Sequence, residues 1–237
     1  MSEEQGKTVP MSAGKRLENF WYHYKWHTLV ALFLIIAIII CSFQMCSKES
    51  FDSYVLYAGG YGISRVVDDD VAEYAVFLSS LSRITPDRNG DGEVNTSFLD
   101  LYIPTSDEIK ETGNDLYALM RDNVTRLQYE LVSGGDYYLC FLSPENYDEY
   151  KLWDGVTLFM PLAAYVPEGT EVKYYDESAV YLKSTAFGNS DGFKNLPDDT
   201  LIALRVPSAV ASFFNKKDNE KRFNEAEELL RSVLSYE

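Results

Sequence analysis

Residues 28–47 form an uncharged, apolar run of 20 residues, and this run restricts the possible fold more than any other feature of the chain. At a rise of about 1.5 Å per residue, a helix of this length spans roughly 30 Å, the thickness of the hydrocarbon core of a bilayer. A buried helix of a soluble protein is the alternative, but such a helix normally has a polar stripe at helical spacing, and this run has none. We therefore expect a membrane-spanning helix, with the lipid bilayer as the partner of residues 28–47.

Charged residues near the run predict its orientation. Lys15, Arg16 and Lys25 precede the run, whereas the acidic triplet 68–70 follows it. Because basic residues beside a membrane helix favour the cytoplasmic side, the N-terminus is predicted to be cytoplasmic. No small-x-small cleavage site follows the run, which favours an uncleaved signal anchor over a removed signal peptide. The predicted organisation is a disordered cytoplasmic tail at 1–14, an interfacial segment and transmembrane helix at 15–47, and an extracytoplasmic domain at 51–237.

The composition of the outer domain excludes several classes of function. The chain has 37 acidic and 21 basic residues, a net charge of −16, and nearly all of this excess lies outside the membrane segment, so we expect no nucleic-acid partner. Cys140 is the only cysteine in 51–237, which precludes an internal disulfide and suits a bacterial envelope. Both histidines, His23 and His27, flank the membrane run. A Ser-His-Asp triad and a His-ligated zinc site are therefore excluded from the outer domain.

The outer domain begins with alternating strand and helix patterns. Short apolar runs predict strands, and longer segments with apolar residues at helical spacing predict helices. An alternating order of this kind is typical of an α/β fold with a parallel sheet covered by helices on both faces. We therefore predict a three-layer α/β domain with a mainly parallel sheet. The predicted order is strand 53–58, helix 66–82, strand 96–103, helix 114–133, strand 137–142 and helix 144–152, followed by strand-like segments 172–182 and 201–206 and a closing helix 219–235.

The segment 87–95 is similar in sequence to a calcium-binding loop. Asp87, Asn89 and Asp91 occupy the first three ligand positions of such a loop. Position 12, which should supply a bidentate carboxylate, is Phe98, and strand-like sequence replaces the expected second helix. A turn rich in Asp, Asn and Gly accounts for the same residues. We expect a turn and no metal or other cofactor, with these three residues as a weak alternative metal site.

A candidate ligand site follows from the predicted topology. In open α/β sheets, ligands bind at the carboxyl ends of the strands. Gly59, Gly60 and Tyr61 follow the first predicted strand, and Ser143 and Asn146 follow the third, where a Ser-Pro pair begins a helix. Glycines permit close approach of a ligand to the backbone, and a tyrosine offers a ring and a hydroxyl. These five residues are the predicted ligand-binding set, and an ordinary turn beside an ordinary helix cap is the alternative.

Two segments resemble known families. The sequence from Gln128 to Leu142 resembles the helix-to-strand segment of extracellular solute-binding proteins, and this resemblance implies one α/β lobe of that kind over about residues 53–165. The aromatic segment from Phe20 to His27, together with the anchor, is similar to uncharacterised single-span envelope proteins of Gram-positive bacteria.

We expect a membrane-anchored binding or interaction domain that is not an enzyme, and whose partner is a small molecule, a glycan or an envelope protein. A carboxylate-dependent cell-wall or polysaccharide hydrolase is one alternative, since acidic residues are plentiful. A structural subunit of a membrane assembly is another.

Overall fold

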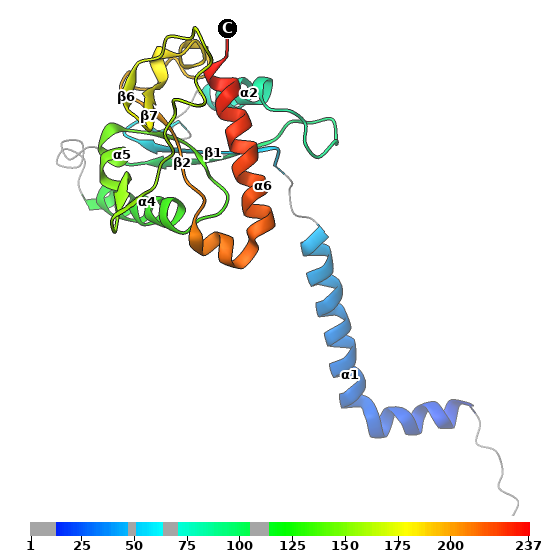
Figure 1. The fold of residues 1–237 in the computed structure, drawn as a ribbon. Coiled ribbons are helices and arrows are strands. Elements are labelled where there is room, and N and C mark those ends of the chain that lie inside the picture. Colours follow the sequence, from blue (N-terminus) through cyan, green and yellow to red (C-terminus); the bar gives the residue numbers. More distant parts are fainter. Residues whose placement is uncertain (1–12, 47–50, 64–70, 105–113) are drawn as a thin grey trace, which may run out of the picture. The chain divides into compact units, whose positions relative to one another are not determined.

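The computed structural model describes residues 13–46, 51–63, 71–104 and 114–237, which belong to two separate units, 1–49 and 50–237 (Figure 1). The first unit contains one long helix, α1 (Ala13–Cys46). Within α1, residues Phe20–Cys41 are long and apolar enough to cross a membrane. The predicted apolar helix is therefore confirmed for the described residues. Most of the predicted tail, 1–12, and Ser47 lie outside them.

The second unit contains a six-stranded sheet with the order β2-β1-β3-β8-β7-β6, and a separate two-stranded hairpin, β4-β5. The strands are β1 (Ser53–Gly59), β2 (Thr96–Tyr102), β3 (Leu139–Leu142), β4 (Leu152–Trp153), β5 (Val156–Thr157), β6 (Tyr174–Asp176), β7 (Ala179–Tyr181) and β8 (Leu201–Leu204). The helices are α2 (Val71–Ile84), α4 (Asn114–Val132), α5 (Pro144–Tyr150) and α6 (Ala209–Leu234), with short 3-10 turns η1 (Leu182–Ser184) and η2 (Phe187–Asn189).

The sheet is mixed, and its two halves differ in direction. The two long strands β1 and β2 pair in parallel, and β3 pairs in parallel with the other side of β1. The remaining pairs, β3-β8, β8-β7 and β7-β6, are antiparallel. The prediction of a mainly parallel α/β sheet is therefore confirmed for the N-terminal half, and the C-terminal strands make the whole sheet mixed.

Alternating residues of β1 face two different apolar layers. Val55 and Tyr57 belong to the core that includes α2 and α6, whereas Leu56 and Ala58 belong to the core that includes α4 and α5. All four residues are buried because helices cover both faces of the sheet, as Figure 1 shows. The predicted three-layer arrangement is therefore confirmed.

Two elements differ most from the predictions, and the helix predicted at 144–152 also ends early, at Tyr150, with Leu152 in β4. The closing helix, predicted at 219–235, begins at Ala209, where the side chain of Ser208 caps it, and it has non-helical backbone angles at Asn215. The predicted strand 172–182 is divided into β6 and β7, which pair as a short antiparallel ribbon. Both differences have a local cause, because a helix kink and a tight reversal interrupt the periodicity on which the predictions depended. The acidic triplet 68–70 lies outside the described residues.

Candidate functional site

The carboxyl ends of β1 and β3 lie side by side, and the connections that follow these two strands lead to opposite sides of the sheet. From β1 the chain continues through α2 to β2 on one side, and from β3 it continues toward α5 and the strands on the other side. In open α/β sheets, ligands bind outside the strand ends at such a divergence. We refer to this end of the sheet as the carboxyl edge.

Two of the predicted site residues meet there through the carbonyl of Ala58. The backbone N–H of Ser143 donates to this oxygen at 2.9 Å, and the side-chain amide of Asn146 donates to it at 3.3 Å. Ser143 also caps α5, because its hydroxyl accepts the N–H of Asn146. The structure thus brings Ser143 and Asn146 to the end of β1, as predicted, and uses both of them to hold β1 against α5.

Gly59 is required by a neighbouring tyrosine. A Cβ atom at position 59 would lie 2.7 Å from the hydroxyl oxygen of Tyr57, which is closer than real Cβ contacts. The same hydroxyl accepts the backbone N–H of Tyr61 at 3.2 Å. Gly59 and Tyr61 are therefore arranged around the Tyr57 hydroxyl, and Gly60 lies between them in the chain as a half-buried bend.

Tyr57 and two carboxylates belong to this edge and were missed by the sequence analysis. Burial raises the pKa of Tyr57, and the negative charges of Asp100 and Asp199 raise it further. The phenol therefore stays protonated at neutral pH. Asp100 is the register partner of Tyr57 on β2, and Asp199 precedes β8, which pairs with β3. Only the strand order brings them together, so no local pattern identifies them.

These groups favour hydrogen bonding over nucleophilic chemistry. Carboxylate oxygens accept hydrogen bonds, and the Tyr57 phenol can both donate and accept one. Cys140 lies in β3, but it is fully buried, and burial raises the pKa of its thiol to about 12, so it remains an unreactive thiol at neutral pH. Within the described ranges no group of three or more His, Cys, Asp or Glu side chains is arranged to hold a metal ion.

The calcium-like segment forms a turn. The carboxylate of Asp87 accepts the N–H of Gly90 at 2.7 Å and that of Gly92 at 3.0 Å. Both glycines have positive φ angles, of 74° and 88°, which a glycine adopts without strain. Asn89 and Asp91 exchange hydrogen bonds within the same turn. The predicted turn is confirmed, and the three weak candidate ligands are engaged in forming it.

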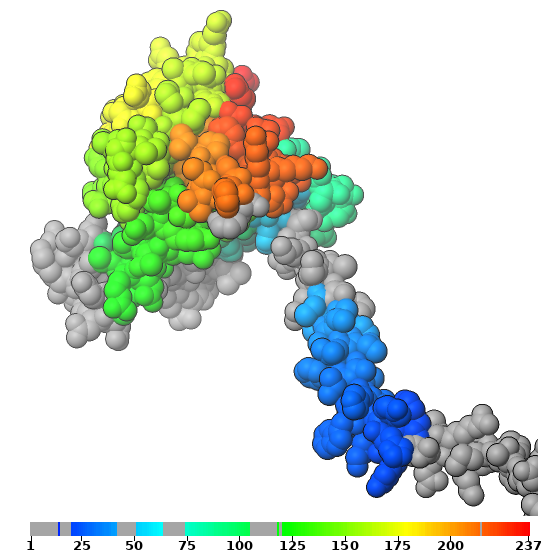
Figure 2. Space-filling model, turned by 60° about the horizontal axis from the view of Figure 1, so that its bottom comes forward, coloured from blue at the N-terminus to red at the C-terminus, as the bar shows by residue number. Residues whose placement is uncertain are grey.

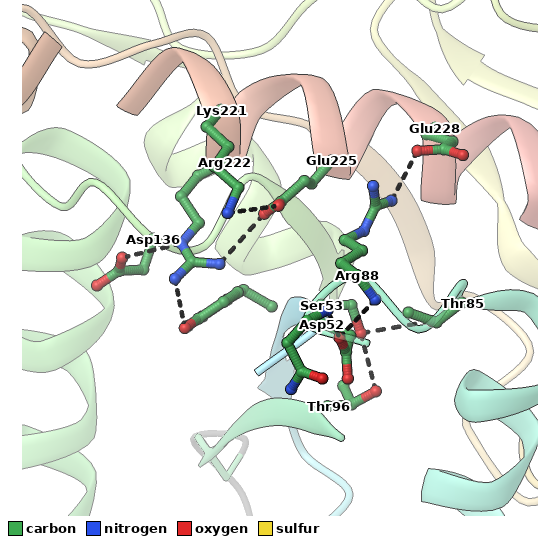
Figure 3. A network of polar contacts seen from close by, with 12 residues as sticks. Asp52, Ser53, Thr85, Arg88, Thr96, Asp136, Lys221, Arg222, Glu225 and Glu228 are labelled. Atoms are coloured by element: carbon green, nitrogen blue, oxygen red, sulfur yellow. Dashed lines mark hydrogen bonds and ion pairs between the residues drawn. The ribbon is translucent and has the colours of Figure 1, made fainter. Parts of the chain in front are cut away.

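A polar network holds this turn at the opposite end of β1 (Figure 3). Asp52 is fully buried, and its carboxylate accepts the N–H groups of Arg88 at 2.8 Å, Asn89 at 3.2 Å and Asn95 at 2.9 Å. The Arg88 guanidinium pairs with Glu228 of α6 at 2.8 Å. The loop is thereby attached both to the start of β1 and to the last helix.

An open groove of about 440 Å³ lies beside this network, between Arg88 and α6. Its α6 lining is formed by Lys217, Glu220, Lys221, Asn224, Glu225 and Glu228. Opposite charges within and beside the groove are paired with one another, as in Arg88–Glu228 and Lys221–Glu225. Because the charges within these pairs compensate one another, we assign the two pairs a structural role.

No family model, curated protein or solved structure matches this chain. The resemblances to solute-binding proteins and to single-span envelope proteins stay predictions.

Proposed function

We propose that this chain is a single-pass membrane protein whose outer domain binds a ligand at the carboxyl edge without catalysing a reaction. The observation that carries the proposal is the divergence of the chain at β1 and β3, where Tyr57, Tyr61 and Asp199 are brought to one edge. Divergent strand ends are the usual ligand-binding position in open α/β sheets.

The anchor and its orientation are supported by α1 and the charges around it. The side chains of the apolar window in α1 are not covered by other described residues, which suits a helix surrounded by lipid. Lys15 and Arg16 precede this window and Lys25 lies near its start, before the uncharged run 28–47, which supports a cytoplasmic N-terminus and an outer domain on the far side of the membrane.

The chemistry of the carboxyl edge supports a neutral, hydroxyl-rich ligand such as a glycan fragment of the envelope. Asp100 and Asp199 would accept hydrogen bonds from sugar hydroxyls, and Tyr61 offers a ring for an apolar sugar face. The net charge of −16 and the two carboxylates disfavour anions. A solute-binding-like lobe, as the sequence resemblance suggests, agrees with this proposal.

Asp199→Asn is expected to lower affinity for soluble peptidoglycan or envelope-polysaccharide fragments by about tenfold, because charge-assisted hydrogen bonds contribute about 1.5–3 kcal/mol. Calorimetric titration of the purified full chain in detergent measures the effect. The matched control is Asp198→Asn, which removes the same charge one residue away, where Asp198 acts on Lys183. Equal affinities for the two variants and the unchanged chain would show that the ligand binds elsewhere.

A hydrolase is the second candidate, because Asp100 pairs in register with Tyr57 and the negative charges of both Asp100 and Asp199 act on the Tyr57 phenol. Two carboxylates flanking a bound sugar are the usual requirement for glycoside hydrolysis. Release of reducing ends from peptidoglycan by the full chain, lost in both Asp100→Asn and Asp199→Asn, would favour this candidate over simple binding.

A further inference from the structure

Exposed apolar side chains of the outer domain gather at the end of the sheet opposite to the carboxyl edge. Among the described residues of 51–237, seven large apolar side chains are exposed, and five of them belong to elements that meet at this opposite end. We refer to these five as the apolar rim. They are Tyr129, Leu152, Val156, Val210 and Phe213.

The topology places the rim residues at this end. Leu204 at the end of β8 pairs with Leu139 at the start of β3, so α6 begins where the parallel strands begin. The Ser208 hydroxyl, which caps α6, donates to the carbonyl of Val132 at the end of α4. Tyr129 in the last turn of α4 is therefore at the same end as Val210 in the first turn of α6.

The β4-β5 hairpin belongs to the same end. The carbonyl of Leu158, the residue that follows the hairpin, accepts the N–H of Val206 at 2.8 Å, two residues after the end of β8. A tight turn at Asp154 and Gly155, both with positive φ, closes the hairpin and leaves Leu152 and Val156 exposed. Figure 2 shows the surfaces of the hairpin region (yellow-green) and of the start of α6 (orange) on one face of the domain.

The chain also enters the domain at this end. β1 begins at Ser53, two residues before Val55, the partner of Leu139. Helix α1 ends at Cys46, so at most about 25 Å of extended chain separates its end from β1. In a chain anchored by α1, the end of the sheet that bears the rim is therefore held within reach of the bilayer surface.

We propose that the apolar rim rests on the outer leaflet of the membrane. Apolar side chains of this kind insert at the boundary between head groups and acyl chains, and neighbouring basic residues interact with lipid phosphates. Lys216 and Lys217 are exposed three and four residues after Phe213 and supply such basic residues, although Lys216 also pairs with Glu220 at 3.6 Å. Contact at the rim would hold the carboxyl edge facing away from the membrane. This inference rests on the membrane anchor of the proposed function.

Spin labels on the full chain in vesicles of phosphatidylcholine and phosphatidylglycerol test the rim. Single cysteines are introduced as Val156→Cys and Val210→Cys, with Asp198→Cys near the carboxyl edge as the matched exposed control, in a Cys41→Ser, Cys46→Ser chain. For each spin label, the rate of collision with oxygen, which concentrates in lipid, is divided by the rate of collision with a water-soluble nickel complex. The oxygen-to-nickel ratio is expected to be severalfold higher at 156 and 210 than at 198.

Three other results would overturn the inference. Equal ratios at all three positions in a chain that resists an alkaline wash would leave the anchor intact and contradict only the rim. Low collision with both reagents at 156 and 210 would mean that protein, such as a second copy, covers the rim. A chain that the alkaline wash removes from the vesicles would contradict the anchor and the rim together. None of these outcomes depends on the glycan titration of Asp199→Asn, so ligand binding at the carboxyl edge is tested separately.

Discussion

Replacement of Arg205 by methionine is expected to destabilise the outer domain by about 3–5 kcal/mol, since three backbone carbonyls lose their donor at a cost of about 1–3 kcal/mol each. Arg205 is fully buried, and its guanidinium donates to the carbonyls of Tyr137 at 3.1 Å, Leu131 at 3.5 Å and Gly134 at 2.8 Å. It also lies over the ring of Tyr138, 4.3 Å from its centroid. The side chain therefore joins the end of α4 and the start of β3 to β8.

The guanidinium geometry makes this role specific to arginine. Burial lowers the pKa of Arg205, while Tyr138, Cys140 and Glu130 act in the opposite direction, and an arginine stays charged at neutral pH in any case. Methionine fills much of the volume but leaves the buried carbonyls of Leu131 and Gly134 without their donor. Lysine cannot reach several carbonyls at once with a fork-shaped group, so Arg205→Lys is expected to restore only a minor part of the stability.

Thermal unfolding of the full chain in detergent measures this effect. For a domain of this size, a loss of about 3–5 kcal/mol corresponds to a melting temperature lower by about 10 °C. The control is Arg121→Met, since Arg121 is largely exposed and its contact with Asp122 is 3.8 Å long. That variant should melt within about a degree of the unchanged chain. The expected difference in melting temperature between Arg205→Met and the control is about 10 °C. A difference of less than about two degrees would contradict the proposed role of Arg205.

The second large effect is expected for Asp52→Ala. Its carboxylate is the partner of the N–H groups of Arg88, Asn89 and Asn95, and alanine removes this acceptor from all three. Each buried donor that loses its partner costs about 1–3 kcal/mol, so we expect a loss of at least about 2 kcal/mol and detachment of the loop from β1. Hydrogen exchange at Asn95 would be accelerated before global unfolding.

Asp52 also makes the stability of the outer domain depend on pH. Burial alone raises the pKa of Asp52, but hydrogen bonds from Asn95, Arg88 and Asn89 and the charge of Arg88 outweigh it, and the pKa lies below its ordinary value. Below the ordinary carboxyl pKa of about 4, the unfolded chain therefore binds the proton more readily than the folded chain. The contribution of Asp52 is fully present above that pH and is lost as the pH falls through the lowered pKa.

Asp52→Asn should therefore remove part of the acid sensitivity of unfolding between about pH 4 and pH 2. The control is Asp91→Asn, because Asp91 is exposed in the neighbouring turn and makes local hydrogen bonds only. Denaturant midpoints at several pH values provide the comparison. If Asp52→Asn and the unchanged chain lose stability in parallel as the pH falls, Asp52 does not contribute in this way.

Local patterns in the sequence were sufficient to predict much of the N-terminal half of the outer domain. The apolar run of β3 and the Ser143-Pro144 cap of α5 both specify their structure within a few residues, and the structure confirms them. The meeting of Gly59 with Ser143 also followed, because parallel strands that alternate with helices place their carboxyl ends together.

Other features depend on pairings that no local pattern contains. β8 lies antiparallel to β3, and only this pairing brings Asp199 to the carboxyl edge beside Tyr57. The first turns of α6 were missed because Val210 and Phe213 are exposed, so they do not continue the apolar stripe that was used to recognise the helix. The exposed apolar side chains that interrupt the helical pattern here are the same side chains that form this part of the apolar rim.

We propose that α1 holds the outer domain outside the cell, and labelling of intact cells tests this directly. Cysteines introduced as Asp198→Cys in the outer domain and as Lys7→Cys in the N-terminal tail are exposed to a membrane-impermeant maleimide, in a chain that lacks Cys41 and Cys46. We expect position 198 to be labelled in intact cells and position 7 only after lysis. Labelling of position 7 with protection of position 198 in intact cells would contradict the account.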